Sequence, residues 1–261
     1  MFEEDYIGGD VRRFLEGLYV RYNRRDLVHP DPLEFLYNYP NPRDREIAGL
    51  IASSLAYGRV SQILKATSSV LECIGTPYDF LMSASLGSLK KIFSGFRYRF
   101  TTGEELAHFL YGIKCVIEEY GSLYRGFADC LGVSDETVLP AMILFIERLY
   151  LYAGFTTSSL LPLPSGKSAF KRFCLFLRWM VRKDDVDIGD WEDIGSSKLL
   201  VPLDTHMYSF ASRMGFTNRK QADIRTVLEI TEHFRRISPS DPVKYDFAIT
   251  RLGILGGKLG V

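Results

Sequence analysis

Helical periodicity runs through nearly the whole chain and restricts the fold more than any other feature. Apolar residues recur at three- and four-residue intervals in long stretches, which are Asp10–Arg24, Arg43–Ala56, Val60–Ile74, Gly103–Tyr120 and Glu136–Tyr152. The alternation of apolar and polar residues that marks a half-buried strand is almost absent. The pattern predicts an all-α protein with a compact body of two lobes, residues 40–155 and residues 1–39 together with 156–261.

The composition favours a packed globular protein and excludes a membrane-spanning one. Hydrophobic residues make up 46% of the 261 positions and aromatic residues 13%, enough for burial to offset chain entropy. The longest apolar run, 173–181, contains Arg178, and the N-terminus lacks the basic-then-apolar order of an export signal. We therefore expect a cytoplasmic protein without a membrane partner. The 32 basic and 32 acidic residues balance, so bulk charge does not predict polyanion binding.

Cysteine and acidic residues give no metal-binding pattern. The four cysteines lie far apart, with neither a CxxC pair nor close spacing to a histidine, and are Cys73, Cys115, Cys130 and Cys174. We expect buried free thiols, no metal and no cofactor. The acidic segment Lys183–Ser197 fits no defined metal-binding loop, so a solvated acidic turn is preferred over a metal-dependent nuclease site.

A helix with one basic face is predicted from about Ser168. At about 100° per residue, a narrow arc of this helix contains Lys167, Lys171, Arg178 and Arg182. Apolar positions surround the arc, so we expect most of the helix to be buried and the basic stripe to face a groove or solvent. The stripe is either an ordinary solvated edge or a surface that faces a polyanion.

Asp204 precedes a predicted helix over Thr205–Met214. An aspartate at this position caps a helix by accepting a backbone N–H bond, which contributes about 0.5–2 kcal/mol and explains the residue without chemistry. The alternative is a catalytic carboxylate. It is favoured by the apolar run Leu199–Leu203, by the basic helix upstream and by His206 two positions later.

The same region resembles the helix-hairpin-helix Gly/Pro-Asp (HhH-GPD) superfamily of DNA glycosylases. Val201–His206 followed by Ser212–Gly215 is similar to the Pro-x-Asp-Thr-His…Arg-x-Gly signature of that superfamily. Leu161–Ala169 resembles its Leu-Pro-Gly-Val-Gly-x-Lys-Thr-Ala hairpin, and segments 51–67 and 95–121 resemble the helices before it. The chain is identified as a member of a divergent bacterial branch, somewhat similar to the archaeal 8-oxoguanine DNA glycosylases.

The resemblance implies base-excision repair of double-stranded DNA, with removal of a damaged purine such as 8-oxoguanine. Asp204 would be the catalytic carboxylate, because negative charge near C1′ stabilises the oxocarbenium character of the transition state. A lysine amine would attack C1′ and form a Schiff base, which permits AP-lyase strand scission. Lys171 is the preferred nucleophile and Lys167 the second candidate. A glycosylase that uses neither lysine stays open.

Both lysines lie further before Asp204 than is usual in the superfamily, so Lys183–Ser197 is interpreted as an insertion. Lys167 occupies the motif position by local alignment. Lys171 is preferred because it is expected one turn inside the helix, where rigid backbone positions a catalytic group better than a loop does. The hairpin also departs from the superfamily, since Pro164 has no N–H to offer a phosphate.

Further residues are assigned by their place in the resemblance. Tyr57 aligns with the wedge that fills the gap left by an extruded base, and its alternative role is turn packing. The other candidate DNA contacts, with surface salt bridges as the alternative, are Arg59, Arg172, His206 and Arg213. The candidates for a base pocket are Phe96, Trp179 and Asp246. Core packing is preferred for the two aromatic residues.

Asp246 is expected to be partly buried and paired with an arginine such as Arg251 or Arg213, in a helix that begins near Asp241 and Pro242. We expect a monomer. Two other function classes stay open beside the glycosylase. One is a nucleic-acid-binding protein that keeps the fold without the chemistry, and the other is a structural helical protein in which Asp204 is only a cap.

Overall fold

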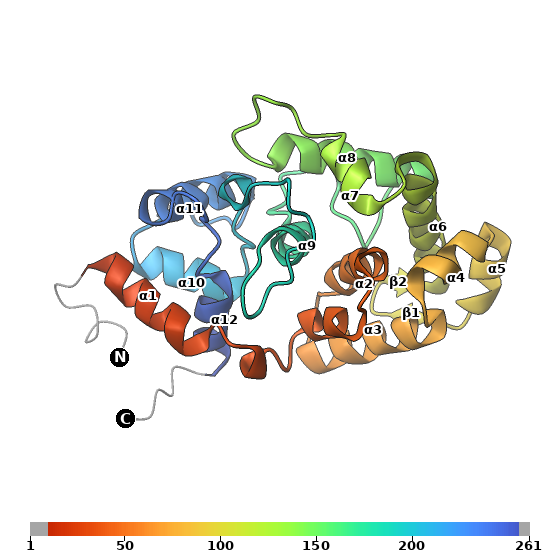
Figure 1. The fold of residues 1–261 in the computed structure, drawn as a ribbon, viewed down its shortest axis with the longest axis horizontal. Coiled ribbons are helices and arrows are strands. Elements are labelled where there is room, and N and C mark those ends of the chain that lie inside the picture. The colour runs from red at the N-terminus through yellow and green to blue at the C-terminus, as the bar shows by residue number, and fades with distance from the viewer. Residues whose placement is uncertain (1–9, 256–261) are drawn as a thin grey trace. The chain divides into compact units, whose positions relative to one another are not determined.

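Helices dominate the computed structural model, which describes residues 10–255 (Figure 1). The only paired strands in this part of the chain are β1 (Arg97–Tyr98) and β2 (Thr101–Thr102), which form a two-stranded antiparallel hairpin. The prediction of a predominantly helical protein is confirmed. Among residues 10–255, none of the helices combines the length and the hydropathy that a bilayer span requires.

The chain divides into two compact units, which are described separately. The central unit is Pro30–Gly166, and the terminal unit combines Met1–His29 with Lys167–Val261. The helices of the central unit are η2 (Pro32–Asn38), α2 (Pro42–Ser54), α3 (Val60–Ile74), α4 (Pro77–Ser83), α5 (Leu86–Ile92), α6 (Gly103–Tyr120), α7 (Leu123–Ala128) and α8 (Leu139–Ala153). Those of the terminal unit are α1 (Val11–Tyr22), η1 (Arg25–Leu27), α9 (Lys171–Val181), η3 (Ser196–Lys198), α10 (Thr205–Arg213), α11 (Ile224–Ile237) and α12 (Asp246–Ile254).

The junctions between the units differ from the boundaries expected after residues 39 and 155. Helix η2 packs against α2 and therefore belongs to the central unit. The segment after α8 is held there by Glu105, whose carboxylate accepts hydrogen bonds from the Ser158 hydroxyl (2.8 Å) and the Ser159 hydroxyl (2.8 Å). These contacts keep residues 155–166 with the helices that precede them.

Helix α6 is the central helix of its unit, and it packs against α5, α7 and α8. Its bounds coincide with the predicted stretch, because Thr102 caps its first turn and Gly121 ends it in a left-handed conformation. Close approach to α8 depends on Gly112, where a Cβ atom would lie 3.1 Å from Ala153 Cβ. A buried glutamate, Glu46, accepts the backbone N–H groups of Leu123 (2.8 Å) and Tyr124 (2.9 Å) at the start of α7.

In the terminal unit, α12 packs against both α1 and α10. The contact with α10 needs Gly253, because a Cβ there would overlap the ring of His206. The core includes the fully buried side chains of Phe176 and Trp179 from α9 and of Phe234 from α11. This unit carries Asp204 and both candidate lysines.

Two helix starts differ from the prediction. Helix α9 begins at Lys171 rather than Ser168, because buried Phe170 has a left-handed backbone (φ 49°) and its N–H bonds to the Ser168 hydroxyl (3.2 Å). Helix α12 begins at Asp246, after a turn that contains Pro242. In both places a local turn precedes the helix and delays the first helical residue.

The prediction of buried free thiols is wrong in part. All four cysteines are free, but only Cys130 and Cys174 are buried. Cys115 is half-buried, and Cys73 is exposed because it lies on the outer face of α3. Cys73 is therefore open to reagents in solution.

Gly103 provides a test of the packing at the start of α6. A Cβ atom at this position would overlap the carbonyl oxygen of Phe93, whereas a Cβ at Gly95 has no heavy atom within 4 Å. Gly103→Ala should lower the free energy of unfolding by at least about 2 kcal/mol, because the backbone must shift to admit the methyl group. Gly95→Ala should stay within about 0.5 kcal/mol of the parent. Urea denaturation measures both, and equal midpoints for the two variants would contradict this account of the turn.

Candidate functional site

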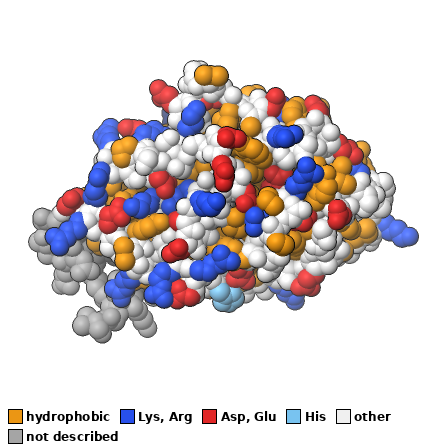
Figure 2. All heavy atoms as spheres, viewed as in Figure 1, with side chains coloured by type: hydrophobic (Ala, Val, Ile, Leu, Met, Phe, Trp, Pro, Cys, Tyr) orange, Lys and Arg blue, Asp and Glu red, His pale blue; other side chains and the backbone are white. Residues whose placement is uncertain are grey.

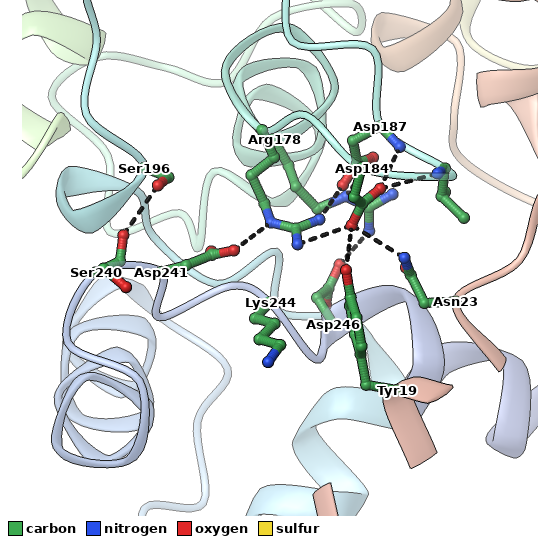
Figure 3. Close-up of polar contacts among 12 residues, drawn as sticks. Tyr19, Asn23, Arg178, Asp184, Asp187, Ser196, Ser240, Asp241, Lys244 and Asp246 are labelled. Carbon is green, nitrogen blue, oxygen red and sulfur yellow. Dashed lines mark hydrogen bonds and ion pairs between the residues drawn. The ribbon is translucent and has the colours of Figure 1, made fainter. Parts of the chain in front are cut away.

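Arg178 of α9 and Arg182, which directly follows this helix, point into the terminal unit rather than toward solvent. Arg178 and Arg182 are only 2% and 4% exposed. A buried guanidinium is tolerated only with charged and hydrogen-bonding partners, and here the partners are carboxylates (Figure 3). The predicted basic stripe is therefore wrong for these two residues. Periodicity identified the face but not what covers it.

Four aspartates surround the two guanidinium groups, and we call these six residues the arginine–aspartate network. Asp187 bonds to both Arg178 and Arg182, and Asp246 bonds to Arg178. Arg182 also contacts Asp184 (2.9 Å) and Asp241 (2.8 Å). The prediction that Asp246 pairs with an arginine is confirmed, but its partner is Arg178 of α9 rather than Arg251 or Arg213.

Helix α1 joins the arginine–aspartate network through Asp184. The hydroxyl of Tyr19 and the side-chain amide of Asn23 each donate to its carboxylate at 3.0 Å (Figure 3). Its other oxygen accepts the N–H groups of Val186 and Asp187, both at 2.8 Å. One aspartate thus links the N-terminal helix to the loop after α9.

The acidic segment Lys183–Ser197 is not simply a solvated turn. Asp187 is buried within it, and the loop folds back on the end of α9. The N–H groups of Ile188 and Gly189 bond to the Trp179 carbonyl at 3.2 and 3.1 Å, and the N–H of Trp191 bonds to the Met180 carbonyl at 2.8 Å. The loop therefore satisfies carbonyl groups that a helix end leaves without intrahelical partners.

Two positive and four negative groups cannot all stay charged at no cost in this buried site. Burial raises the pKa of Asp246 to about 7, although the Arg178 guanidinium opposes the shift and the Asp204 charge adds to it. Burial also raises the pKa of Asp187 against the effect of both arginines. For Asp184 the opposite holds, because Arg182 and backbone N–H bonds outweigh burial and lower its pKa. Asp246 is the group whose charge changes near neutral pH.

Asp204 caps α10, as its position in the sequence predicts. One carboxylate oxygen accepts the N–H of Met207 at 2.7 Å. The residue is half-buried, and among residues 10–255 no other group hydrogen-bonds to its carboxylate. The negative charge of Asp204 contributes to the raised pKa of Asp246. The Oδ1 atom of Asp246 is buried without a hydrogen-bond partner in the described chain. Asp204 is thus a fixed carboxylate with one oxygen still available.

Both candidate lysines keep their amines available. Lys171 is half-buried and is the first residue of α9, not one turn inside it as expected. Lys167 is exposed in the connection before α9, where its carbonyl accepts the N–H of Ile224 at 3.4 Å. Within the described residues, neither ammonium group forms an ion pair or a hydrogen bond. The predicted hairpin around them is a longer connection, 154–170, with a turn at 163–166.

The other predicted residues of the terminal unit are divided between surface and core. Arg213 is exposed at the end of α10, and Arg172 and His206 are half-buried. Trp179 is fully buried, which agrees with core packing. Asp246 is buried in the arginine–aspartate network.

The predicted residues of the central unit lie at or near the β1–β2 hairpin. The Tyr57 ring packs on the Tyr98 ring, with centroids 4.9 Å apart, and its hydroxyl contacts the Tyr98 carbonyl (3.1 Å) and the Thr101 hydroxyl (2.6 Å). These contacts fit turn packing, and a wedge role stays a prediction. Arg59 is exposed just before α3, and Phe96 is half-buried.

The arginine–aspartate network is the main feature that sequence reasoning missed. The signal was present in two arginines four residues apart within an apolar helix, followed directly by an acid-rich segment. Together these features fit a buried pair of arginines better than a solvated stripe. Asp241, which lies far along the chain, left no local signal, and the apolar neighbours of Asp246 indicated a buried pair with an arginine but not which arginine.

Replacement of Asp246 tests the charge balance of the network. A carboxyl with a raised pKa in the folded state contributes stability at acidic pH and loses it as pH rises through about 7. The parent should therefore lose about 1–3 kcal/mol more unfolding free energy than Asp246→Asn between pH 5 and 8. Denaturant titrations at several pH values measure this difference. Asp185→Asn, at an exposed position of the same acidic segment, should follow the parent, and parallel curves for parent and Asp246→Asn would contradict the assignment.

Comparison with known proteins places the chain in a family. A model of the family described as "Protein of unknown function (DUF2400)" matches residues 31–255. No curated protein and no solved structure matches the chain. Because the match spans most of the chain, including α9, the arginine–aspartate network and Asp204, this protein belongs to the DUF2400 family.

Proposed function

We propose that this protein is a DNA glycosylase of the HhH-GPD type, with or without AP-lyase activity, that removes a damaged purine such as 8-oxoguanine from double-stranded DNA. The proposal rests chiefly on Asp204. Its cap bond holds the carboxylate in one orientation and leaves the other oxygen without a partner in the described residues. The motif around it, Pro202 to His206, resembles the catalytic segment of that superfamily.

Asp204 would act on the sugar of the flipped nucleotide. Cleavage of the N-glycosidic bond leaves positive character at C1′ and O4′, and a nearby carboxylate stabilises that charge without moving. The base departs with the electrons of the broken bond. A carboxylate already fixed by a backbone N–H needs little reorganisation at this step.

A lysine would supply the nucleophile in the lyase reaction. Its neutral amine forms a bond to C1′ as the base leaves, and Asp204 accepts the proton that the nitrogen loses. Opening of the sugar ring then gives the Schiff base. The nitrogen of such a lysine must not be tied up in an ion pair. Lys171 and Lys167 both meet this requirement, because neither forms an ion pair with an acidic side chain in the described part of the chain. Lys171 stays the first choice because a helix start positions it.

One alternative is supported by specific observations. The cap bond alone accounts for Asp204, and the arginine–aspartate network removes Arg178 and Arg182 from the surface. Basic and acidic side chains are also interspersed over the face drawn in Figure 2. These features suit a non-catalytic nucleic-acid-binding or structural helical protein that retains the fold.

Borohydride trapping on duplex DNA with 8-oxoguanine, together with a panel of other lesions, tests the proposal. The parent should form a covalent adduct that Lys171→Gln abolishes and Lys167→Gln retains. Asp204→Asn should slow base release at least about 100-fold. Because asparagine also caps helices well, this variant should unfold at the parent's temperature.

The remaining outcomes separate the alternatives. Base release that depends on Asp204 without an adduct would identify a glycosylase that does not use lysine. An adduct lost only in Lys167→Gln would move the nucleophile to that residue. No base release and no adduct on any lesion would overturn the proposal, and DNA binding that survives Asp204→Asn would then favour the binding protein.

A further inference from the structure

The central unit contains an open groove of about 510 Å³ that the proposed chemistry does not use. One wall is the exposed face of α3, with Gln62, Lys65 and Cys73. The opposite wall runs from the end of α5 into β1 and includes Phe96 and Arg97. Its volume lies in the range of small-molecule sites, which is about 300–1,000 Å³.

The groove has the charge of an anion site. Lys65 and Arg97 are both exposed, and neither side chain forms a hydrogen bond or an ion pair with another described residue. Among residues 10–255, no acidic side chain lines the groove. Elsewhere many surface cations are paired, as Lys90 is with Glu104 and Arg148 is with Asp129. Two unneutralised cations that line one groove therefore give a local positive potential that suits a phosphate.

The rest of the lining suits a planar, hydrogen-bonding group. Phe96 offers part of an aromatic face, on which a nucleobase can stack. Gln62 carries both a donor and an acceptor, which can pair with the edge of a base. The buried side chains of Phe93 and Tyr98 also line the groove and make this part of its surface apolar.

One wall, formed by residues 93–98, is held in place by contacts within the central unit. The turn that leads into Phe96 is closed by its N–H, which bonds to the Phe93 carbonyl at 2.9 Å. The same carbonyl packs against Gly103, where no side chain fits. Tyr98 is held by its ring contact with Tyr57. A preformed site loses less entropy when a ligand binds.

We propose that this groove binds a nucleotide, with the phosphate between Lys65 and Arg97 and the base on Phe96. The nucleotide is either free or part of a single strand, since both present the same phosphate and base. The site is separate from the proposed catalytic residues, because Asp204, Lys171 and Lys167 do not line it; of the residues that the resemblance assigns, only Phe96 does.

Cys73 is a reporter for occupancy, because it is exposed and lines the groove. The rate of its alkylation by iodoacetamide is followed by peptide mass spectrometry, which separates it from the half-buried Cys115. Saturating adenosine 5′-monophosphate or a 5′-phosphorylated single-stranded oligonucleotide should slow the reaction at least about fivefold. Protection by the mononucleotide identifies a free ligand, and protection by the oligonucleotide alone identifies a strand. No protection by either would overturn the proposal.

Variants separate the phosphate from the base. Lys65→Gln and Arg97→Gln should each abolish protection, whereas Arg125→Gln, an exposed cation of α7 outside the groove, should retain it. Phe96→Leu should weaken nucleotide binding about tenfold, because stacking is lost. Ribose 5-phosphate should protect poorly, and equal protection by it would overturn the assignment of the base. Thermal melts show that each variant is folded.

The two proposals fail separately. Asp204→Asn should keep full protection of Cys73, because the residue lies outside the groove. Loss of glycosylase activity with intact protection would remove only the catalytic proposal. Trapped adducts without protection of Cys73 would remove only the groove.

Discussion

The terminal unit depends on the burial of Arg178 and Arg182. Two buried guanidinium groups, one in α9 and one directly after it, would be prohibitive to desolvate without partners, and removal of one partner from such a buried pair typically costs about 3–5 kcal/mol. The chain meets this requirement from places far apart in the sequence, namely α1, the loop after α9 and the turn before α12. The same contacts therefore compensate the buried charges and hold these segments together.

The network also connects the structural core with the candidate site. Asp246 bonds to Arg178 through one oxygen, and the charge of Asp204 adds to the rise of its pKa. Perturbed carboxyls concentrate at functional sites, although structural ion-pair networks also produce them. Asp246 belongs to such a network, and α12, which it begins, packs on the helix that Asp204 caps.

Sequence reasoning succeeded where the determinants are local. The stretches over α3 and α6 were predicted with their full bounds, and the cap at Asp204 was predicted from its position before an amphipathic segment. It failed where a distant contact or one unusual dihedral decides. The left-handed backbone of Phe170 makes α9 begin later than predicted. The carboxylate of Asp246, far from α9 in the sequence, pairs with Arg178 and allows this arginine to be buried. The groove left no signal either, because Lys65 and Arg97 lie far apart in the sequence and come to line one groove only in the folded unit.

Burial of the network changes what the net charge implies. The chain has 32 basic and 32 acidic residues, and the network withdraws two arginines but four aspartates from that balance. The residues outside it therefore carry a small positive excess, and the cations without acidic partners in the described chain include Lys171, Lys167, Lys65 and Arg97. A neutral total is thus weak evidence against a phosphate-bearing ligand. What decides is whether particular cations are left unpaired, and Lys171, Lys167, Lys65 and Arg97 meet that condition among the described residues.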